Sequence, residues 1–235
     1  MSADKFSSAI GAVDWNGNVA AFLKNATSSK KLQDTNERIA IWARQFEIVD
    51  KGNPALSFVR EMQLCGLHVA ALIALGLYKS AAASMRAIFE TALYYTYFRT
   101  HPTELASLVR LDDFYLDKKE LLEYHKTHTP NFVEFQSKLG VLSQSKKWYA
   151  EMSGIIHGQT PGKWSKHTSL SDIKTIDEIA SAVVDAFAHG VEITHHLFLC
   201  TVAQEMWDQI SSDAKEKLRS GLAGDVKQAL GLDAA

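Results

Sequence analysis

The chain has 235 residues, of which 46% are hydrophobic and 22% charged, the composition of a globular protein with a sizeable core. This balance excludes a disordered chain, and four prolines with thirteen glycines are too few for a collagen-like protein and sparse for an all-β one. Lys and Arg number 25 against 27 Asp and Glu, so the net charge is −2. Any case for nucleic acid or a membrane surface must therefore be local.

Cysteine usage and the N-terminal segment indicate the compartment. Cys65 and Cys200 both lie in apolar stretches, where a thiol behaves as a small hydrophobic group. The N-terminus lacks the basic flank and apolar run of a secretory signal. The most apolar run, Leu64 to Leu77, is shorter than the roughly 20 residues that a membrane helix needs. We therefore expect a cytoplasmic protein that does not contact a membrane.

The first hundred residues carry strong helical patterns. Residues 1–30 hold short helical stretches broken by polar residues and predict a peripheral cap. Between Lys31 and Val49, apolar residues recur at three- and four-residue steps, as in an amphipathic helix. Ala55 to Ala74 and Ala81 to Arg99 then form two apolar stretches, with Ser80 as the expected N-cap of the second. Together the two stretches predict a helical hairpin.

The rest of the chain continues this pattern. We expect a helix from Thr103 to about His125, a helix that begins at Ser143 or Ser145 and ends at His157, and a loop over residues 158–174. One long helix from Thr175 to Ile210 and a weaker terminal helix to Leu230 follow.

We find no strand pattern, internal repeat or Pro/Gly/Ser-rich linker. The sequence therefore predicts an all-α fold, an up-and-down helical bundle with a central buried helical hairpin. Residues 1–235 are expected to form a single domain.

Arg86 and Glu90 are the first candidate functional residues. They lie one turn apart on the most apolar predicted helix, so they share a face and can pair. Either the pair is structural and orients two helices, or Arg86 binds an anion. Tyr94 and Tyr97 extend the same stripe and can add hydroxyl donors.

The segment from Ser143 to His167 is locally basic. Aromatic rings lie among its lysines, and this mixture provides cations for phosphate and faces for bases. Solvated lysines beside core tryptophans would give the same pattern. The candidate nucleic-acid-binding residues are Lys146, Lys147, Lys163, Lys166 and Trp164.

Ser153 and His157 lie within this segment, four residues apart and so on one helix face. His157 occupies the last predicted turn, where the helix dipole favours a protonated imidazole. Such a group can stabilise a phosphate or protonate a leaving oxygen in RNA cleavage, or simply cap the helix.

The last long helix carries two carboxylates and two imidazoles on one face. Such a face can hold a divalent metal, although a solvated polar face has the same pattern and no second Glu-x-x-His motif completes a di-iron site. The residues are Asp185, His189, Glu192 and His196.

The hairpin ALIALGLYKSAAASMRAIFETALYYTYF, with SGIIHG further along, resembles the HEPN superfamily of small helical domains, including its abortive-infection-type members. The resemblance covers about residues 55–100 and 143–160. It implies a bundle of four or five helices, frequent homodimerisation, and metal-independent RNA cleavage without a cofactor in toxin or phage-defence systems. The family's Arg-x4–6-His motif is absent here.

On this resemblance, we expect a homodimer that binds or cleaves RNA, or binds a nucleotide. Arg86 and Lys147 would hold phosphate, with Glu90 orienting Arg86. Ser153 and His157 would meet the 2′-hydroxyl or the leaving oxygen. Two other functions stay open: a non-catalytic helical interaction module, and a metal-binding bundle that uses the polar face of the last long helix.

Overall fold

The computed structural model describes residues 3–232, and these residues form helices and connecting segments without a strand. The α-helices are α1 (Ala3–Gly11), α2 (Trp15–Lys24), α3 (Ala26–Val49), α4 (Leu56–Ala74), α5 (Tyr78–Phe98), α6 (Pro102–Arg110), α7 (Lys118–His128), α8 (Phe132–Leu139), α9 (Val141–Ile156), α10 (Asp177–Cys200), α11 (Ala203–Met206), α12 (Ser212–Arg219) and α13 (Gly224–Ala229). Two 3-10 turns, η1 (Leu170–Asp172) and η2 (Trp207–Gln209), complete the elements.

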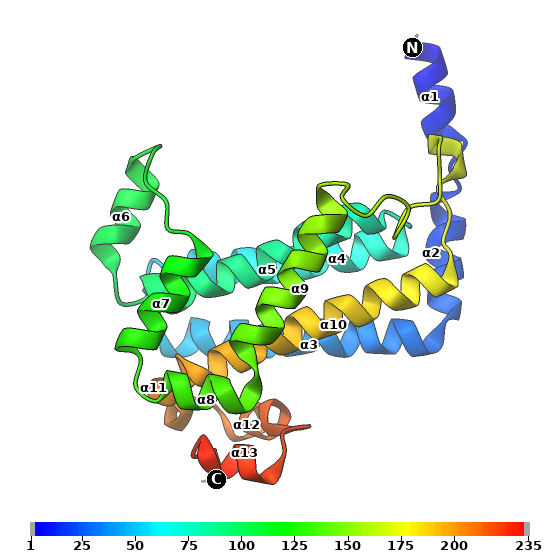
Figure 1. The fold of residues 1–235 in the computed structure, drawn as a ribbon. Coiled ribbons are helices and arrows are strands. Elements are labelled where there is room, and N and C mark those ends of the chain that lie inside the picture. Colours follow the sequence, from blue (N-terminus) through cyan, green and yellow to red (C-terminus); the bar gives the residue numbers. More distant parts are fainter. Residues whose placement is uncertain (1–2, 233–235) are drawn as a thin grey trace.

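Four long helices form the centre of the molecule (Figure 1). Helix α3 packs on α4, α4 on α5, α5 on α10, and α10 on α3. The all-α bundle with a central hairpin is therefore confirmed. In a strict up-and-down bundle, consecutive helices run in opposite directions. Helix α10 departs from this rule, because it runs parallel to α3. The Ser28 and Ser181 hydroxyls meet in the first turns of the two helices (2.9 Å), and Trp42 meets His195 further along both.

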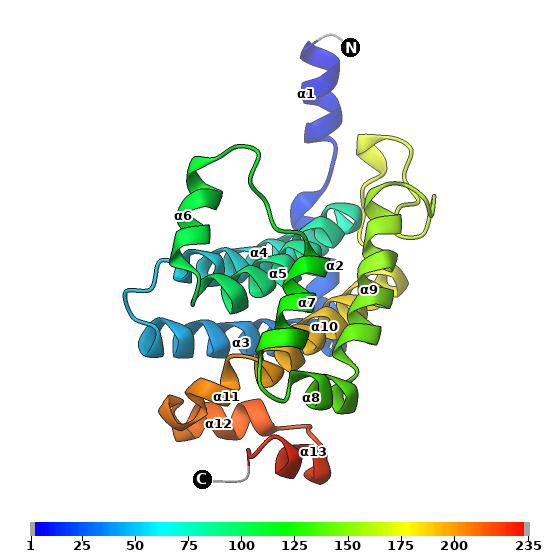
Figure 2. The ribbon, with the colours of Figure 1, turned by 60° about the vertical axis from the view of Figure 1, so that its left-hand side comes forward.

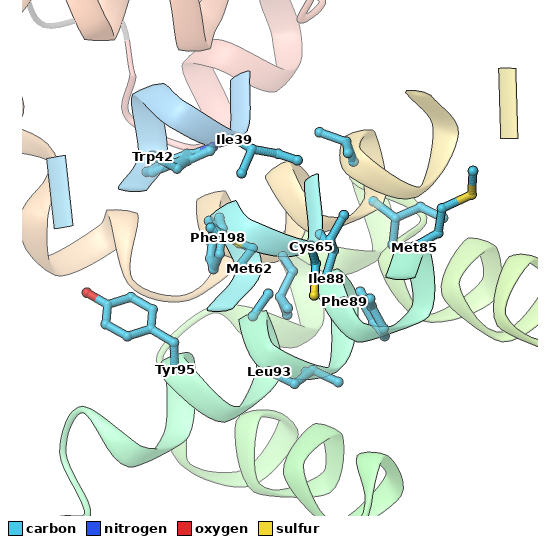
Figure 3. Close-up of a cluster of buried hydrophobic side chains, with 14 of the residues drawn as sticks. Ile39, Trp42, Met62, Cys65, Met85, Ile88, Phe89, Leu93, Tyr95 and Phe198 are labelled. Atoms are coloured by element: carbon cyan, nitrogen blue, oxygen red, sulfur yellow. The ribbon is translucent and has the colours of Figure 1, made fainter. Parts of the chain in front are cut away.

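Helix α5 is buried on most of its surface because its apolar residues meet three neighbouring helices. Figure 3 shows its side chains converging with those of α3, α4 and α10. The labelled residues are Ile39, Trp42, Met62, Cys65, Met85, Ile88, Phe89, Leu93, Tyr95 and Phe198, and all are at most 5% exposed. Burial of such side chains is the main stabilising contribution to a bundle of this kind.

Helix α4 packs along α5 and α3, but Leu64 and Leu67 on its outer face are exposed. Among the described helices, it is the one that is long and apolar enough to span a membrane by length and composition, and 39% of its tested window is buried. The expectation of no membrane contact was based on the shorter run from Leu64 to Leu77, whereas α4 has 19 residues. The absence of membrane contact therefore stays a prediction.

Several predicted helix boundaries are wrong. The expected helix from Thr103 to His125 is divided into α6 and α7, because Asp117 forms a capping box with Glu120 and starts a new helix. Helix α5 begins at Tyr78 rather than after Ser80. Helix α9 begins directly after Gly140, which adopts a left-handed conformation (φ 67°) that favours glycine.

The C-terminal prediction is wrong in the same way. The helix expected from Thr175 to Ile210 ends at Cys200, and short helical segments follow it. The terminal helix expected up to Leu230 is two helices, α12 and α13, with residues 220–223 between them.

At the other terminus, the predicted peripheral cap covers residues 1–30, of which residues 1–2 lie outside the described part. Its two short helices, α1 and α2, differ in how they pack. Helix α1 extends away from the bundle (Figures 1 and 2), whereas Phe22 of α2 is 2% exposed and belongs to the core.

Helix α9 crosses α5 and α10 on one side of the bundle (Figure 1). The Trp148 indole N–H donates to the Ala186 carbonyl of α10 (2.8 Å) and fixes the crossing. Helix α9 ends at Ile156, with His157 as its C-cap and Gly158 at φ 70°, as the sequence predicts. Residues 158–176 then return the chain to the start of α10, beside the start of α5.

Candidate functional site

Arg86 and Glu90 form the expected ion pair on α5, with a distance of 2.9 Å between Arg86 Nη2 and Glu90 Oε1. Tyr149 of α9 is a third member, because its hydroxyl donates to Glu90 Oε1 and accepts from Arg86 Nη2. Tyr149 was missed as a partner because it lies far away in the sequence. The cluster connects the central helix α5 to the crossing helix α9.

Two cations lie over the Tyr149 ring. Arg86 Cζ is 4.3 Å and Lys118 Nζ is 4.1 Å from the ring centroid. Burial, together with the Glu90 carboxylate, raises the pKa of Tyr149 to about 12, so the hydroxyl stays protonated. Burial and then the charge of Arg86 lower the pKa of Lys118. The Tyr149 hydroxyl, Glu90 Oε1 and Arg86 Nη2 are therefore occupied by one another, whereas Arg86 Nε is buried without a hydrogen-bond partner among the described residues.

A pocket of about 270 Å³ adjoins the cluster on its α7 side. Glu90, Lys118 and Tyr149 form part of its wall, and Tyr94 adds a ring whose hydroxyl donates to the Leu116 carbonyl (3.3 Å). Tyr115 completes the aromatic wall from the exposed segment before α7, a residue that sequence reasoning did not single out.

His157 lies further along α9 than Tyr149. His157 follows Tyr149 by eight positions, a rise of about 12 Å along the helix axis. His157 is exposed and Ser153 is half-buried. Among the described residues, no hydrogen bond or ion pair joins Arg86 to His157, so the direct contacts of Arg86 are with Glu90 and Tyr149.

The end of α9, the start of α5 and the following loop enclose a second candidate site. Two pockets, of about 380 and 400 Å³, share Tyr78, Trp164 and His167, and we call them together the loop groove. The charged residues in its wall are three lysines and one aspartate: Lys79, Lys166, Lys174 and Asp172. A Cβ placed on Gly158 would lie 4.0 Å from Lys79 Nζ, so Lys79 lies beside the end of α9.

The predicted nucleic-acid-binding residues lie in three different environments. Trp164 is 6% exposed and forms part of the wall of both pockets, so its ring does not present a full face for stacking. Lys166 is exposed in the groove, whereas Lys163 pairs with Glu151 (2.5 Å). Lys146 and Lys147 are exposed on the first turns of α9 and are not part of the groove wall.

The polar face of α10 does not assemble a metal site within residues 3–232, where no group of three or more suitable side chains converges. Asp185 pairs with Lys31 (2.6 Å), and His189 lies 4.0 Å from Glu192. The neighbouring His195 is buried, and its Nδ1 accepts a hydrogen bond from Trp42 Nε1 (3.0 Å).

No family model matches this chain, and neither a curated protein nor a solved structure does.

Proposed function

We propose that the protein binds RNA or a nucleotide through the loop groove. The observation that carries the proposal is that two neighbouring pockets of metabolite size, which share wall residues, are both lined by lysine: Lys166 and Lys174 in one and Lys79 in the other. The whole chain is slightly acidic, so this local excess of lysine is where a phosphate would be held. The HEPN resemblance of the hairpin and of the SGIIHG segment points to the same class of ligand.

The groove combines two kinds of contact that such a ligand needs. Lysine ammonium groups attract phosphate, and His167 adds an imidazole beside them. Tyr78 and Trp164 are mostly buried, so they supply a small apolar area of wall against which the edge of a base or a ribose can pack, rather than a face for stacking. In this proposal the Arg86 cluster does not touch the ligand. Instead it positions α9, so that His157 and the loop stay beside the start of α5.

Direct binding tests this proposal. A fluorescein-labelled single-stranded RNA decamer and ATP are titrated with the intact chain, the variant Lys79→Gln/Lys166→Gln and the control Lys24→Gln/Lys51→Gln. The two substitutions of the control remove exposed lysines outside the groove, so the control has the same change in net charge as the groove variant. We expect at least tenfold weaker binding for the groove variant and no change for the control. Equal binding by all three proteins, or no binding at all, would refute the proposal and favour a non-catalytic interaction module.

RNA cleavage in a toxin or phage-defence setting is the further step that the resemblance implies. His157 is exposed and directly precedes Gly158, next to which Lys79 Nζ lies, so in this proposal its imidazole reaches a phosphate held by Lys79. Incubation of labelled RNA with the protein and EDTA should give cleavage that His157→Ala abolishes while RNA affinity is kept. Growth arrest on induction that disappears with the same variant would support the toxin role. If the intact protein shows neither RNA cleavage nor growth arrest, the proposed function is limited to binding.

Homodimerisation is part of the same proposal, since HEPN-like domains frequently pair. Sedimentation velocity of the purified chain across a range of concentrations tests it, and a species of monomer mass throughout would contradict it.

A further inference from the structure

A third hollow, separate from the sites above, lies between α3 and α10 and has a volume of about 660 Å³. We call it the α3–α10 groove. The residues in its wall are Thr27, Lys30, Lys31, Asp34, Thr35, Arg38, Asp185, Ala188, His189, Val191 and Glu192. It contains three of the four residues that the sequence suggested as metal ligands, so the question is which ligand its charges favour.

Most charges in this groove are already matched. Lys30 pairs with Asp34 along α3, and Lys31 pairs with Asp185 across the groove (2.6 Å). Because these two ammonium groups occupy two of the three carboxylates in the wall, a metal dication would have to displace them to gain more than Glu192, and it would also meet the positive charge of Arg38.

Two charged wall residues remain outside these pairs: Glu192, which has only His189 at 4.0 Å, and Arg38. Arg38 is half-buried, and its guanidinium makes no hydrogen bond or ion pair with any residue from 3 to 232. The other half-buried arginines in that range, Arg86, Arg99 and Arg219, are bonded to carboxylates or to a backbone carbonyl. A planar donor fork held at the edge of a groove without an acceptor is suited to a bidentate oxyanion.

The positive field of Arg38 extends to α10. Burial is the largest cause of the lowered pKa of His195 and of His196. The charge of Arg38 lowers both pKa values further, although for His196 the Glu192 carboxylate acts in the opposite direction. An anion placed beside Arg38 would meet this positive charge and be stabilised by it.

We propose that the α3–α10 groove binds a small oxyanion, a carboxylate or a phosphate, with Arg38 as its principal ligand. The volume suits a metabolite-sized molecule rather than a polymer. This inference goes beyond the proposed RNA or nucleotide function and does not rest on it, because the two grooves share no residue.

Isothermal titration calorimetry with inorganic phosphate and with succinate, each against chloride at equal ionic strength, tests the proposal and distinguishes the two anions. We expect saturable binding of one probe to the intact chain, at least tenfold weaker binding to Arg38→Gln, and intermediate binding to Arg38→Lys. Arg44→Gln removes an exposed arginine of the same helix outside the groove and should bind as the intact chain does. A Kd weaker than about 10 mM for both probes, or equal effects of Arg38→Gln and Arg44→Gln, would overturn the proposal.

A second measurement needs no variant. Phenylglyoxal modifies accessible arginines, and mass spectrometry of the digested intact protein gives the rate at each one. The bound anion should slow modification of Arg38 several-fold and leave Arg44 unchanged. Equal rates at Arg38 with and without the anion would contradict the assignment even if calorimetry detected binding elsewhere.

Discussion

Two histidines are buried in uncharged form, and their burial makes stability depend on pH. His125 lies between the Thr96 and Thr129 hydroxyls (2.9 and 2.8 Å), and burial lowers its pKa to about 4. For His195, which accepts from Trp42, burial and then the charge of Arg38 lower the pKa well below its ordinary value. Both side chains are therefore neutral in the folded protein at neutral pH.

Acid should destabilise the fold through these two residues. Below pH about 6.5 the unfolded chain takes up protons that the folded chain does not, so the free energy of unfolding falls as pH falls, by about 1.4 kcal/mol per pH unit for each histidine. The contribution of His125 is fully present above pH 6.5 and is lost progressively down to its folded pKa of about 4. Urea unfolding at pH 7.5, 6.0 and 5.0 measures this slope. The variant His125→Gln should show a smaller slope, and an identical slope would contradict the assignment.

The Arg86 cluster gives the second prediction at this scale. Arg86→Ala removes the cationic partner of Glu90, which keeps its hydrogen bond from Tyr149, and one of the two cations over the Tyr149 ring. We expect the free energy of unfolding to fall by about 1–3 kcal/mol. RNA affinity should change less than twofold if the cluster only positions α9. Chemical denaturation and the RNA titration are performed on the same preparation, with the exposed Arg44→Ala as control. A tenfold loss of affinity in a stably folded Arg86→Ala protein would return Arg86 to the binding site.

Contacts between residues close in the sequence could be predicted, whereas contacts between distant segments could not. The Arg86–Glu90 pair follows from a four-residue spacing on one helix, which any helical assignment fixes. Tyr149 and Lys118 reach the same cluster only because α9 and α7 pack against α5. No local pattern specifies that packing, and the burial of Trp164 likewise depends on how the loop returns to α5.

At the scale of the elements, the contact between α9 and α10 depends on one glycine. A Cβ on Gly190 would lie 2.3 Å from the Trp148 ring, closer than real atoms approach. The Trp148 ring is held there by its hydrogen bond to Ala186, so it cannot simply turn away. The sequence predicted both helices but not this close approach, which depends on the angle at which they cross.

Gly190→Ala should therefore destabilise the protein by about 1–3 kcal/mol, although alanine is the better helix former. Gly11→Ala is the matched control, because a Cβ there meets nothing within 4 Å and α1 extends away from the bundle. Thermal and urea unfolding of both variants measure the difference. A Gly190→Ala protein as stable as the intact chain would mean that α9 can shift on α10 at little cost.

Helix boundaries show the limit of sequence patterns at the same scale. The bundle helices α3, α4 and α5 were predicted because each repeats apolar residues over several turns. The wrong boundaries lie where a single capping group decides, as at Asp117, or where the chain leaves α10 after Cys200. These outcomes depend on competing local hydrogen bonds of similar energy, which periodicity does not resolve.

At the scale of the whole molecule, the fold brings distant segments together at one end of the bundle. The start of α5, the end of α9 and the start of α10 meet there, because α10 runs parallel to α5 and the intervening chain returns to the same end. The Ile176 N–H donates to the Tyr78 hydroxyl (3.1 Å) and joins two of these segments. The loop groove is thus a product of topology, and its lysines come from separate parts of a chain whose net charge is −2.

That charge distribution sets the expected salt dependence of RNA binding. If Lys79, Lys166 and Lys174 each neutralise about one phosphate, the logarithm of the binding constant should fall with the logarithm of salt concentration with a slope of about −2. Because the rest of the surface is slightly acidic, no long-range attraction should steepen this slope. Fluorescence anisotropy with the RNA decamer between 50 and about 300 mM KCl measures it, and Lys79→Gln/Lys166→Gln should make the slope shallower, about −0.7. A slope near zero in the intact chain would show that phosphate contacts contribute little, and one steeper than about −4 would require a larger basic surface than the loop groove provides.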